Sequence, residues 1–116
     1  MPEYTVVEQG RLGPSRRTDE FEGDEYGAGV SYILVDMPPG AGVRLHRHPY
    51  PEIFIVQEGQ ATYTVGSATL EVQAPQTVLV SAAVPHAFVN SGDGPLRQVD
   101  IHVSPKFITE WLEPGA

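Results

Sequence analysis

Glycine and proline set the strongest constraint on the fold, because they recur at short intervals along almost the whole chain. There are 12 glycines and 11 prolines among 116 residues, and they separate short runs rich in β-forming residues. Many short strands at such close spacing are typical of an antiparallel sandwich or barrel. The pattern therefore predicts an all-β protein with strands at 31–37, 43–48, 52–58, 60–65, 68–72, 77–81, 86–90 and 96–103.

Size and charge narrow the class of protein. A chain of 116 residues is expected to form one domain with one real core. The formal net charge of -8 disfavours nucleic acid and anionic lipid as partners, and no apolar run approaches the ~20 residues of a membrane span. With no cysteine, disulfides and thiolate metal sites are excluded. The N-terminus lacks the features of a signal peptide, so we expect a cytoplasmic protein.

One run of the sequence concentrates residues that bind metal ions. His46 and His48 are two residues apart, so on a strand they share a face. Glu52 follows at even spacing and rejoins that face if the intervening turn is tight, and His86 begins a later strand. Three imidazoles and one carboxylate suit a divalent transition metal. The spacing therefore predicts a metal site made by His46, His48, Glu52 and His86.

The same run resembles the first motif of the cupin superfamily. That motif reads glycine, five residues, His-x-His, three residues, glutamate, six residues and glycine, and here it is matched by Gly40, His46, His48, Glu52 and Gly59. The second cupin motif is matched in part. Its histidine and asparagine are present as His86 and Asn90, whereas the positions that shape its turn hold Pro75, Ser81 and Ala83. The departure puts the geometry of this turn in question more than the ligands.

The resemblance implies a double-stranded β-helix, the jelly-roll barrel of cupins, over residues 30–105. Residues 1–29, rich in glycine and charge, are expected to form an N-terminal arm with an edge strand. Residues 106–116 are expected to form a short helix and tail, since Phe107, Ile108, Trp111 and Leu112 have helical spacing.

We expect one divalent transition metal per chain, with Mn, Fe, Ni, Cu and Zn all compatible with these ligands. Four protein ligands on an octahedral ion leave two positions for a substrate. The alternative is a cupin scaffold whose histidines are ordinary hydrogen-bonded polar residues without a metal.

His102 is the remaining histidine, and its strand has two different faces. One face carries Val99, Ile101 and Val103, and the other carries Asp100 and His102. If the apolar face is covered by a second subunit, alternation turns Asp100 and His102 into the barrel. His102 is then a candidate catalytic residue. Strand parity adds four candidates for the substrate pocket, namely Phe54, Phe88, Asp100 and Arg44.

These features favour a small metal-dependent enzyme, dioxygenase-like, that acts on a small organic molecule. A metal-dependent isomerase or lyase fits the same ligands, as does a non-catalytic module that binds a small ligand. We further expect a homodimer, in which the apolar outer stripe is covered and a strand at Tyr4–Val7 crosses to the partner.

Overall fold

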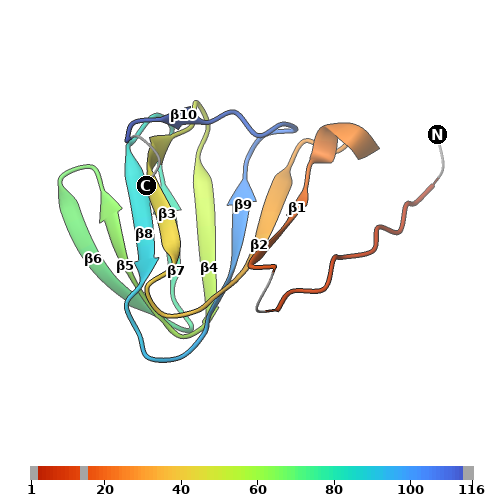
Figure 1. The fold of residues 1–116 in the computed structure, drawn as a ribbon. Coiled ribbons are helices and arrows are strands. Elements are labelled where there is room, and N and C mark those ends of the chain that lie inside the picture. The colour runs from red at the N-terminus through yellow and green to blue at the C-terminus, as the bar shows by residue number, and fades with distance from the viewer. Residues whose placement is uncertain (1–2, 14–15, 114–116) are drawn as a thin grey trace.

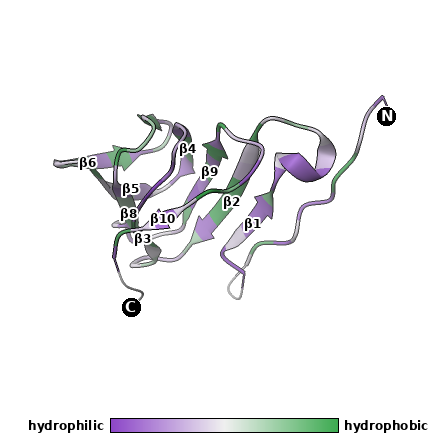
Figure 2. Ribbon diagram, turned by 90° about the horizontal axis from the view of Figure 1, so that it is seen from above, coloured by the Kyte–Doolittle hydropathy of each residue, from purple (hydrophilic) through white to green (hydrophobic). Residues whose placement is uncertain are grey.

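Alternation of inward apolar and outward polar residues builds two antiparallel sheets that face each other across one core (Figures 1 and 2). The computed structural model describes residues 3–13 and 16–113. The first sheet has the strand order β1 (Thr18–Phe21), β2 (Ser31–Met37), β9 (Leu96–His102), β4 (Glu52–Glu58) and β7 (Thr77–Val80). The second has the order β10 (Glu110–Trp111), β3 (Gly42–Arg47), β8 (His86–Asn90), β5 (Gln60–Val65) and β6 (Ala68–Gln73).

From β2 to β9 the chain repeatedly changes sheets, and only the β5–β6 hairpin stays within one. This winding makes a jelly-roll, so the predicted fold class is confirmed. All eight predicted strands form, within one or two residues of the expected ends. The turn between β4 and β5 needs Gly59, which has a φ of +91° and would place a Cβ atom 2.3 Å from the carbonyl oxygen of Pro95.

Two elements lie in the segment that the sequence presented as an arm. β1 pairs with β2, and a short 3-10 helix η1 (Gly23–Tyr26) follows it. The ring of Phe21 stacks on Tyr32 at 4.8 Å and on Tyr26 at 5.1 Å between ring centroids, which fixes this segment to the outer face of the first sheet. The edge strand is therefore β1. Tyr4–Val7 pairs with no strand in the described part of a single chain, and the side chains of Tyr4 and Val6 are exposed.

The barrel interior changes character from one end to the other. Along β9 the inward residues run from Leu96 through Gln98 and Asp100 to His102, all of them buried. The apolar end is packed by a cluster that includes Tyr63 and side chains from both sheets. The polar end gathers the histidines. Hydrophobic burial thus stabilises one end of the sandwich, and buried polar side chains occupy the other end.

The short C-terminal helix is not formed. Residues 105–112 cross the polar end of the barrel without helical structure, and we call them the C-terminal strap (Figure 1). Within it, β10 pairs with β3, and the peptide N–H of Leu112 donates to the carbonyl oxygen of Leu45 at 3.0 Å. Peptide groups that would form hydrogen bonds within a helix instead pair with β3 of the barrel. This tertiary pairing outweighs the helical spacing of the apolar residues. No helix among the described residues has the length and apolar character to cross a membrane.

Candidate metal centre

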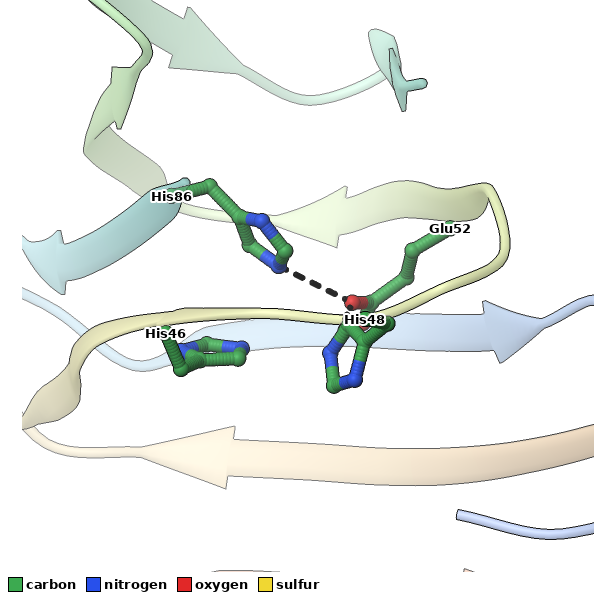
Figure 3. A group of neighbouring side chains, drawn as sticks. All are labelled: His46, His48, Glu52 and His86. Atoms are coloured by element: carbon green, nitrogen blue, oxygen red, sulfur yellow. Dashed lines mark hydrogen bonds and ion pairs between the residues drawn. The ribbon is translucent and has the colours of Figure 1, made fainter. Parts of the chain in front are cut away.

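Strand pairing brings the four predicted ligands together at the polar end of the barrel. His46 on β3 lies directly opposite His86, the first residue of β8. Glu52 is the first residue of β4, and His48 lies in the turn that leads to it. All four side chains are buried, and their ligand atoms lie within 4.8 Å of one another. Figure 3 shows the three rings and the carboxylate converging on one point.

Glu52 lies at the centre of the cluster. Its Oε1 is 3.1 Å from His48 Nε2 and 3.1 Å from His86 Nε2, and its Oε2 is 3.1 Å from His102 Nε2. Only the His86 contact has the alignment of a hydrogen bond, and it is one only in the form of the ring that carries a proton on Nε2. The other two contacts are equally short but lie off the N–H axis, so His48 Nε2 and His102 Nε2 are buried without a hydrogen-bond partner among the described residues.

The other ring nitrogen of each ligand histidine faces a backbone carbonyl oxygen. His46 Nδ1 lies 2.7 Å from the oxygen of Arg44, and His86 Nδ1 lies 2.9 Å from that of Val84. His48 Nδ1 lies 2.8 Å from the oxygen of Ile108 in the strap. A carbonyl only accepts, so each Nδ1 carries the proton and each neutral ring leaves a lone pair on Nε2.

This arrangement fits a metal ion. Three imidazole lone pairs and a carboxylate directed at one buried point repel one another, and a cation between them removes the repulsion. Among the described residues the Nε2 of His48 forms no hydrogen bond, although it lies 3.1 Å from Glu52 Oε1. Carbonyl partners on Nδ1 are also the usual way in which metal-binding histidines are oriented.

The pKa values favour the ligand forms of these groups. Burial lowers the pKa of His46 to about 4, so this ring stays neutral. Burial alone raises the pKa of Glu52, but the imidazoles of His102, His48 and His86 outweigh that effect and hold the pKa well below its usual range. The centre therefore presents a neutral imidazole and an ionised carboxylate at neutral pH.

A cavity of about 240 Å³ opens beside the cluster, between the two sheets and the strap. Its wall is mostly apolar and includes the two predicted aromatic residues, Phe54 and Phe88. The strap adds Phe107, Thr109 and Trp111, at alternating positions. Of the predicted polar residues, Asp100 and His102 line the same cavity.

His102 lies inside the barrel and is 3% exposed. Its strand neighbour across β4 is Glu52. Its Nδ1 lies 2.7 Å from the hydroxyl oxygen of Tyr50, and that oxygen also accepts the peptide N–H of Ile108 at 3.2 Å. Sequence reasoning missed Tyr50, which lies between two prolines and reads as part of a turn.

Asp100 belongs to a second buried chain of hydrogen bonds. The hydroxyl of Tyr63 donates to Gln98 Oε1 at 2.8 Å, and Gln98 Nε2 donates to Asp100 Oδ1 at 2.8 Å. Burial, and then the charge of Glu52, raise the pKa of Asp100 well above its usual value. Asp100 therefore keeps its proton to a higher pH than an ordinary aspartate does.

Arg44 is a correction to the predicted pocket. Its guanidinium lies outside the cavity, 4.1 Å from the ring centroid of Trp111, and donates to the carbonyl oxygen of Glu113. The reason is an irregularity in β3 between Val43 and His46, which shifts the register against β8. Val43 and His46 both face inward as a result, and Arg44 turns to solvent.

Comparison with known proteins agrees with this geometry. The family described as "Cupin domain" matches residues 33–102. The chain is similar to "Polyketide synthase CurC" of Streptomyces cyaneus, with 36% identity over 73 residues, which is 62% of this chain and 47% of that protein. It therefore spans about half the length of that relative.

Among solved structures, an oxalate decarboxylase studied for its substrate binding mode and a reaction specificity switch matches with a TM-score of 0.75 and 26% identity. The match covers 82% of this chain and 27% of that one. A structure of the Bacillus subtilis enzyme, studied for its Mn(II) centres, matches with a TM-score of 0.74, the same identity and the same coverage.

Proposed function

Because the chain belongs to the Cupin domain family, we propose that it is a metal-dependent enzyme that acts on a small, largely apolar carbonyl compound. The observation that carries the proposal is the convergence of His46, His48, Glu52 and His86 on one buried point beside the cavity. The unpaired Nε2 of His48 adds to it. When bound, a divalent metal would polarise a carbonyl group of the substrate and lower the energy of its enolate.

The comparisons support a divalent metal without selecting among Mn, Fe, Ni, Cu and Zn. Imidazole and carboxylate ligands accept all of these ions, and their relative affinities depend on availability as well as geometry. Manganese is the first ion to test, because a similar structure was studied for its Mn(II) centres.

The cavity wall supports a neutral substrate. Among the residues that the structure describes there, none is a lysine or arginine, and Glu20 and Asp100 are acidic. A small dianion such as oxalate would find no cationic side chain in this wall, whereas Phe54, Phe88 and Phe107 offer apolar surface. A β-diketone combines an apolar body with two carbonyl oxygen atoms. Carbonyl groups in this 1,3 relation are typical of polyketides, and the name of the similar Streptomyces protein contains that word.

The residues around the cavity would divide the work. The apolar wall excludes water and holds the body of the substrate. Asp100 is held at Oδ1 by Gln98, and its protonated form, which the raised pKa favours, would donate a hydrogen bond from its other oxygen to a substrate oxygen. A buried acid so held is a group that can stabilise negative charge developing on a carbonyl oxygen.

Two reaction classes follow from this arrangement. The first candidate is isomerase or lyase chemistry through an enolate. It is favoured because one similar protein is an oxalate decarboxylase and another is named as a polyketide synthase. Dioxygenase chemistry is the second candidate, because an apolar cavity admits dioxygen beside the substrate. A module that binds such a ligand without turnover is the third.

The test starts from chelator-treated protein reloaded with Mn, Fe, Ni or Zn. Each form is incubated with 1-phenyl-1,3-butanedione and, separately, with oxalate, with and without oxygen, and products are followed by mass spectrometry. We expect metal-dependent change of the diketone and none of oxalate. Turnover that stops without oxygen identifies the dioxygenase, and turnover that continues identifies the enolate chemistry. Saturable, metal-dependent binding without any product would identify the binding module. Neither turnover nor metal-dependent binding would contradict the proposal.

A further inference from the structure

His102 differs from the three ligand histidines in what its Nδ1 contacts. The Nδ1 atoms of His46, His48 and His86 each face a carbonyl oxygen at 2.7–2.9 Å, which can only accept. His48 Nδ1 also has a longer contact of 3.3 Å with the hydroxyl of Thr109, but its nearer partner is the carbonyl oxygen. The Nδ1 of His102 instead faces the hydroxyl of Tyr50, which can donate or accept. The location of the proton on His102 is therefore decided by Tyr50.

The surroundings of Tyr50 decide which way its hydroxyl points. Its oxygen already accepts the peptide N–H of Ile108, and Tyr50 is buried. Among the described residues, the only other hydrogen-bond partner of this hydroxyl is His102 Nδ1. If Nδ1 carried the proton, the hydroxyl hydrogen would be buried without an acceptor, which is unfavourable.

It follows that the hydroxyl of Tyr50 donates to Nδ1 and that neutral His102 carries its proton on Nε2. This N–H lies 3.1 Å from Glu52 Oε2. The contact is off the N–H axis, but a polar hydrogen this close to a buried carboxylate still attracts it. Oε1 meanwhile faces His48 and His86. The two oxygens of Glu52 thus have separate partners, one on the ligand side and one on His102.

We propose that Tyr50 fixes His102 in the Nε2–H form, so that His102 positions Glu52 for metal binding and is not a fifth ligand. The proposal rests on the metal site proposed above. It assigns to Tyr50 and His102 a role through Glu52, whereas the sequence suggested that His102 itself takes part in the reaction.

The direct test is NMR of protein labelled with ¹⁵N in histidine, in the metal-free and Zn(II)-loaded states. Long-range ¹H–¹⁵N spectra distinguish a protonated, a bare and a zinc-bound ring nitrogen. We expect three rings with the proton on Nδ1, whose Nε2 binds zinc on loading. We expect His102 to keep its proton on Nε2 in both states. A proton on Nδ1 of His102, or zinc on its Nε2, would overturn the proposal.

Zinc affinity, measured by competition with a chromogenic chelator, gives an independent readout. Tyr50→Phe should lower the affinity about tenfold, the lower end of the effect expected for groups that orient metal ligands. The matched control is Tyr63→Phe, which also removes one buried tyrosine hydroxyl, but from the chain that leads through Gln98 to Asp100. Zinc affinity and the His102 spectrum should be unchanged in that control. Equal affinity in wild type and Tyr50→Phe would contradict the proposal.

A pair of variants separates positioning from packing. His102→Gln keeps an N–H donor, and His102→Ala removes it. We expect His102→Gln to bind zinc nearly as tightly as wild type and His102→Ala about tenfold more weakly. Equal losses of zinc affinity in the two variants would show that the N–H donor of His102 does not contribute to metal binding. If wild type binds no metal at all, the proposed function fails, while the spectrum of the metal-free protein still reads the proton position on His102.

Discussion

At the residue scale, the four candidate ligands depend on one another, because their lone pairs and the carboxylate repel one another unless a cation lies between them. His48→Ala combined with His86→Ala removes two of three imidazoles and leaves Glu52 with a weak site. We expect the double variant to lose nearly all bound divalent metal, whereas the wild type holds about one ion per chain. Elemental analysis after identical purification measures this. The exposed Arg47→Ala is the control, and equal metal in wild type and the double variant would refute the ligand assignment.

Asp100 should leave a signature in the pH dependence of stability. Its pKa is raised in the folded protein above the ordinary 3.8, so between these two values the folded state binds more protons than the unfolded state. Stability then decreases as pH rises through this window. Asp100→Asn cannot ionise, so metal-free Asp100→Asn should be more stable than wild type at pH 7.5 and similar near pH 4.

Urea denaturation at the two pH values measures the difference. Asp93→Asn, which removes a carboxylate at the exposed surface, is the control and should leave the profile of wild type unchanged. A constant offset between Asp100→Asn and wild type at both pH values would contradict the assignment of a raised pKa.

The sequence predicted the ligands because their positions follow strand periodicity and a family motif. His46, His48, Glu52 and His86 converge as expected. Two features could not be predicted from strand periodicity or from the motif. The irregularity in β3 that turns Arg44 outward leaves no mark in the residue pattern. The contact of Tyr50 with His102 joins side chains far apart in the chain, so it exists only once the sheets have paired.

At the scale of elements, the turn before β8 shows how the chain keeps a motif while changing its residues. Ala83 stands where the cupin motif has a glycine, and it adopts a φ of +69°. Its peptide N–H donates to the carbonyl oxygen of His48 at 2.7 Å, so the strained conformation is held next to a ligand. Alanine in this region is less favourable than glycine by roughly 1–2 kcal/mol.

Ala83→Gly should therefore stabilise the protein, by about 1 kcal/mol once the greater freedom of glycine in the unfolded chain is subtracted. The neighbouring Ala82 lacks a positive φ, so Ala82→Gly should destabilise by about 0.5–1 kcal/mol. Urea denaturation of the two variants gives both values. The same sign of change in both would show that the strain at Ala83 is not significant.

The C-terminal strap shows why local pattern fails for a short element. Helical spacing of four apolar residues predicted a helix, yet Phe107, Thr109 and Trp111 alternate into the cavity as on a strand. Both periodicities fit so few residues, and contacts with the barrel decide between them.

Ile108 is the residue through which the strap reaches the metal centre. Its side chain is 51% exposed, whereas its carbonyl oxygen and N–H contact His48 and Tyr50. Ile108→Pro removes the N–H and should lower zinc affinity about tenfold, while Ile108→Ala should bind like wild type. Chelator competition measures both. A large loss of zinc affinity in Ile108→Ala would mean that the side chain of Ile108, and not its backbone, supports metal binding.

At the scale of the whole molecule, the outer face of the first sheet carries a group of apolar side chains. Paired positions across β2, β9, β4 and β7 form an outer apolar face consisting of Tyr32, Leu34, Ile53, Ile55, Leu79, Val99 and Ile101. A contiguous surface of this kind is typical of an interface. We expect a second copy of the chain to cover it, in agreement with the homodimer that the sequence suggested.

Leu79 is the residue to change, because it is 65% exposed and contributes little to the core. Leu79→Glu places a charge on the outer apolar face and should convert a dimer of twice 12.6 kDa into a monomer without loss of β-structure. Light scattering at tens of micromolar measures the mass, with the exposed Leu70→Glu on β6 as the control. A wild type that already has the mass of one chain would rule out the dimer.

The carbonyl oxygen and the N–H of Ile108 contact His48 and Tyr50, so the position of the strap and the binding of an ion would be thermodynamically linked. If closure of the strap tightens metal binding by some factor, an ion in the centre must favour the closed strap by that same factor. The strap also forms one wall of the cavity, so the same cycle would couple the ion to the enclosure of a bound ligand. Loading with metal would then do more than supply a Lewis acid. It would also help to close the cavity around a bound ligand.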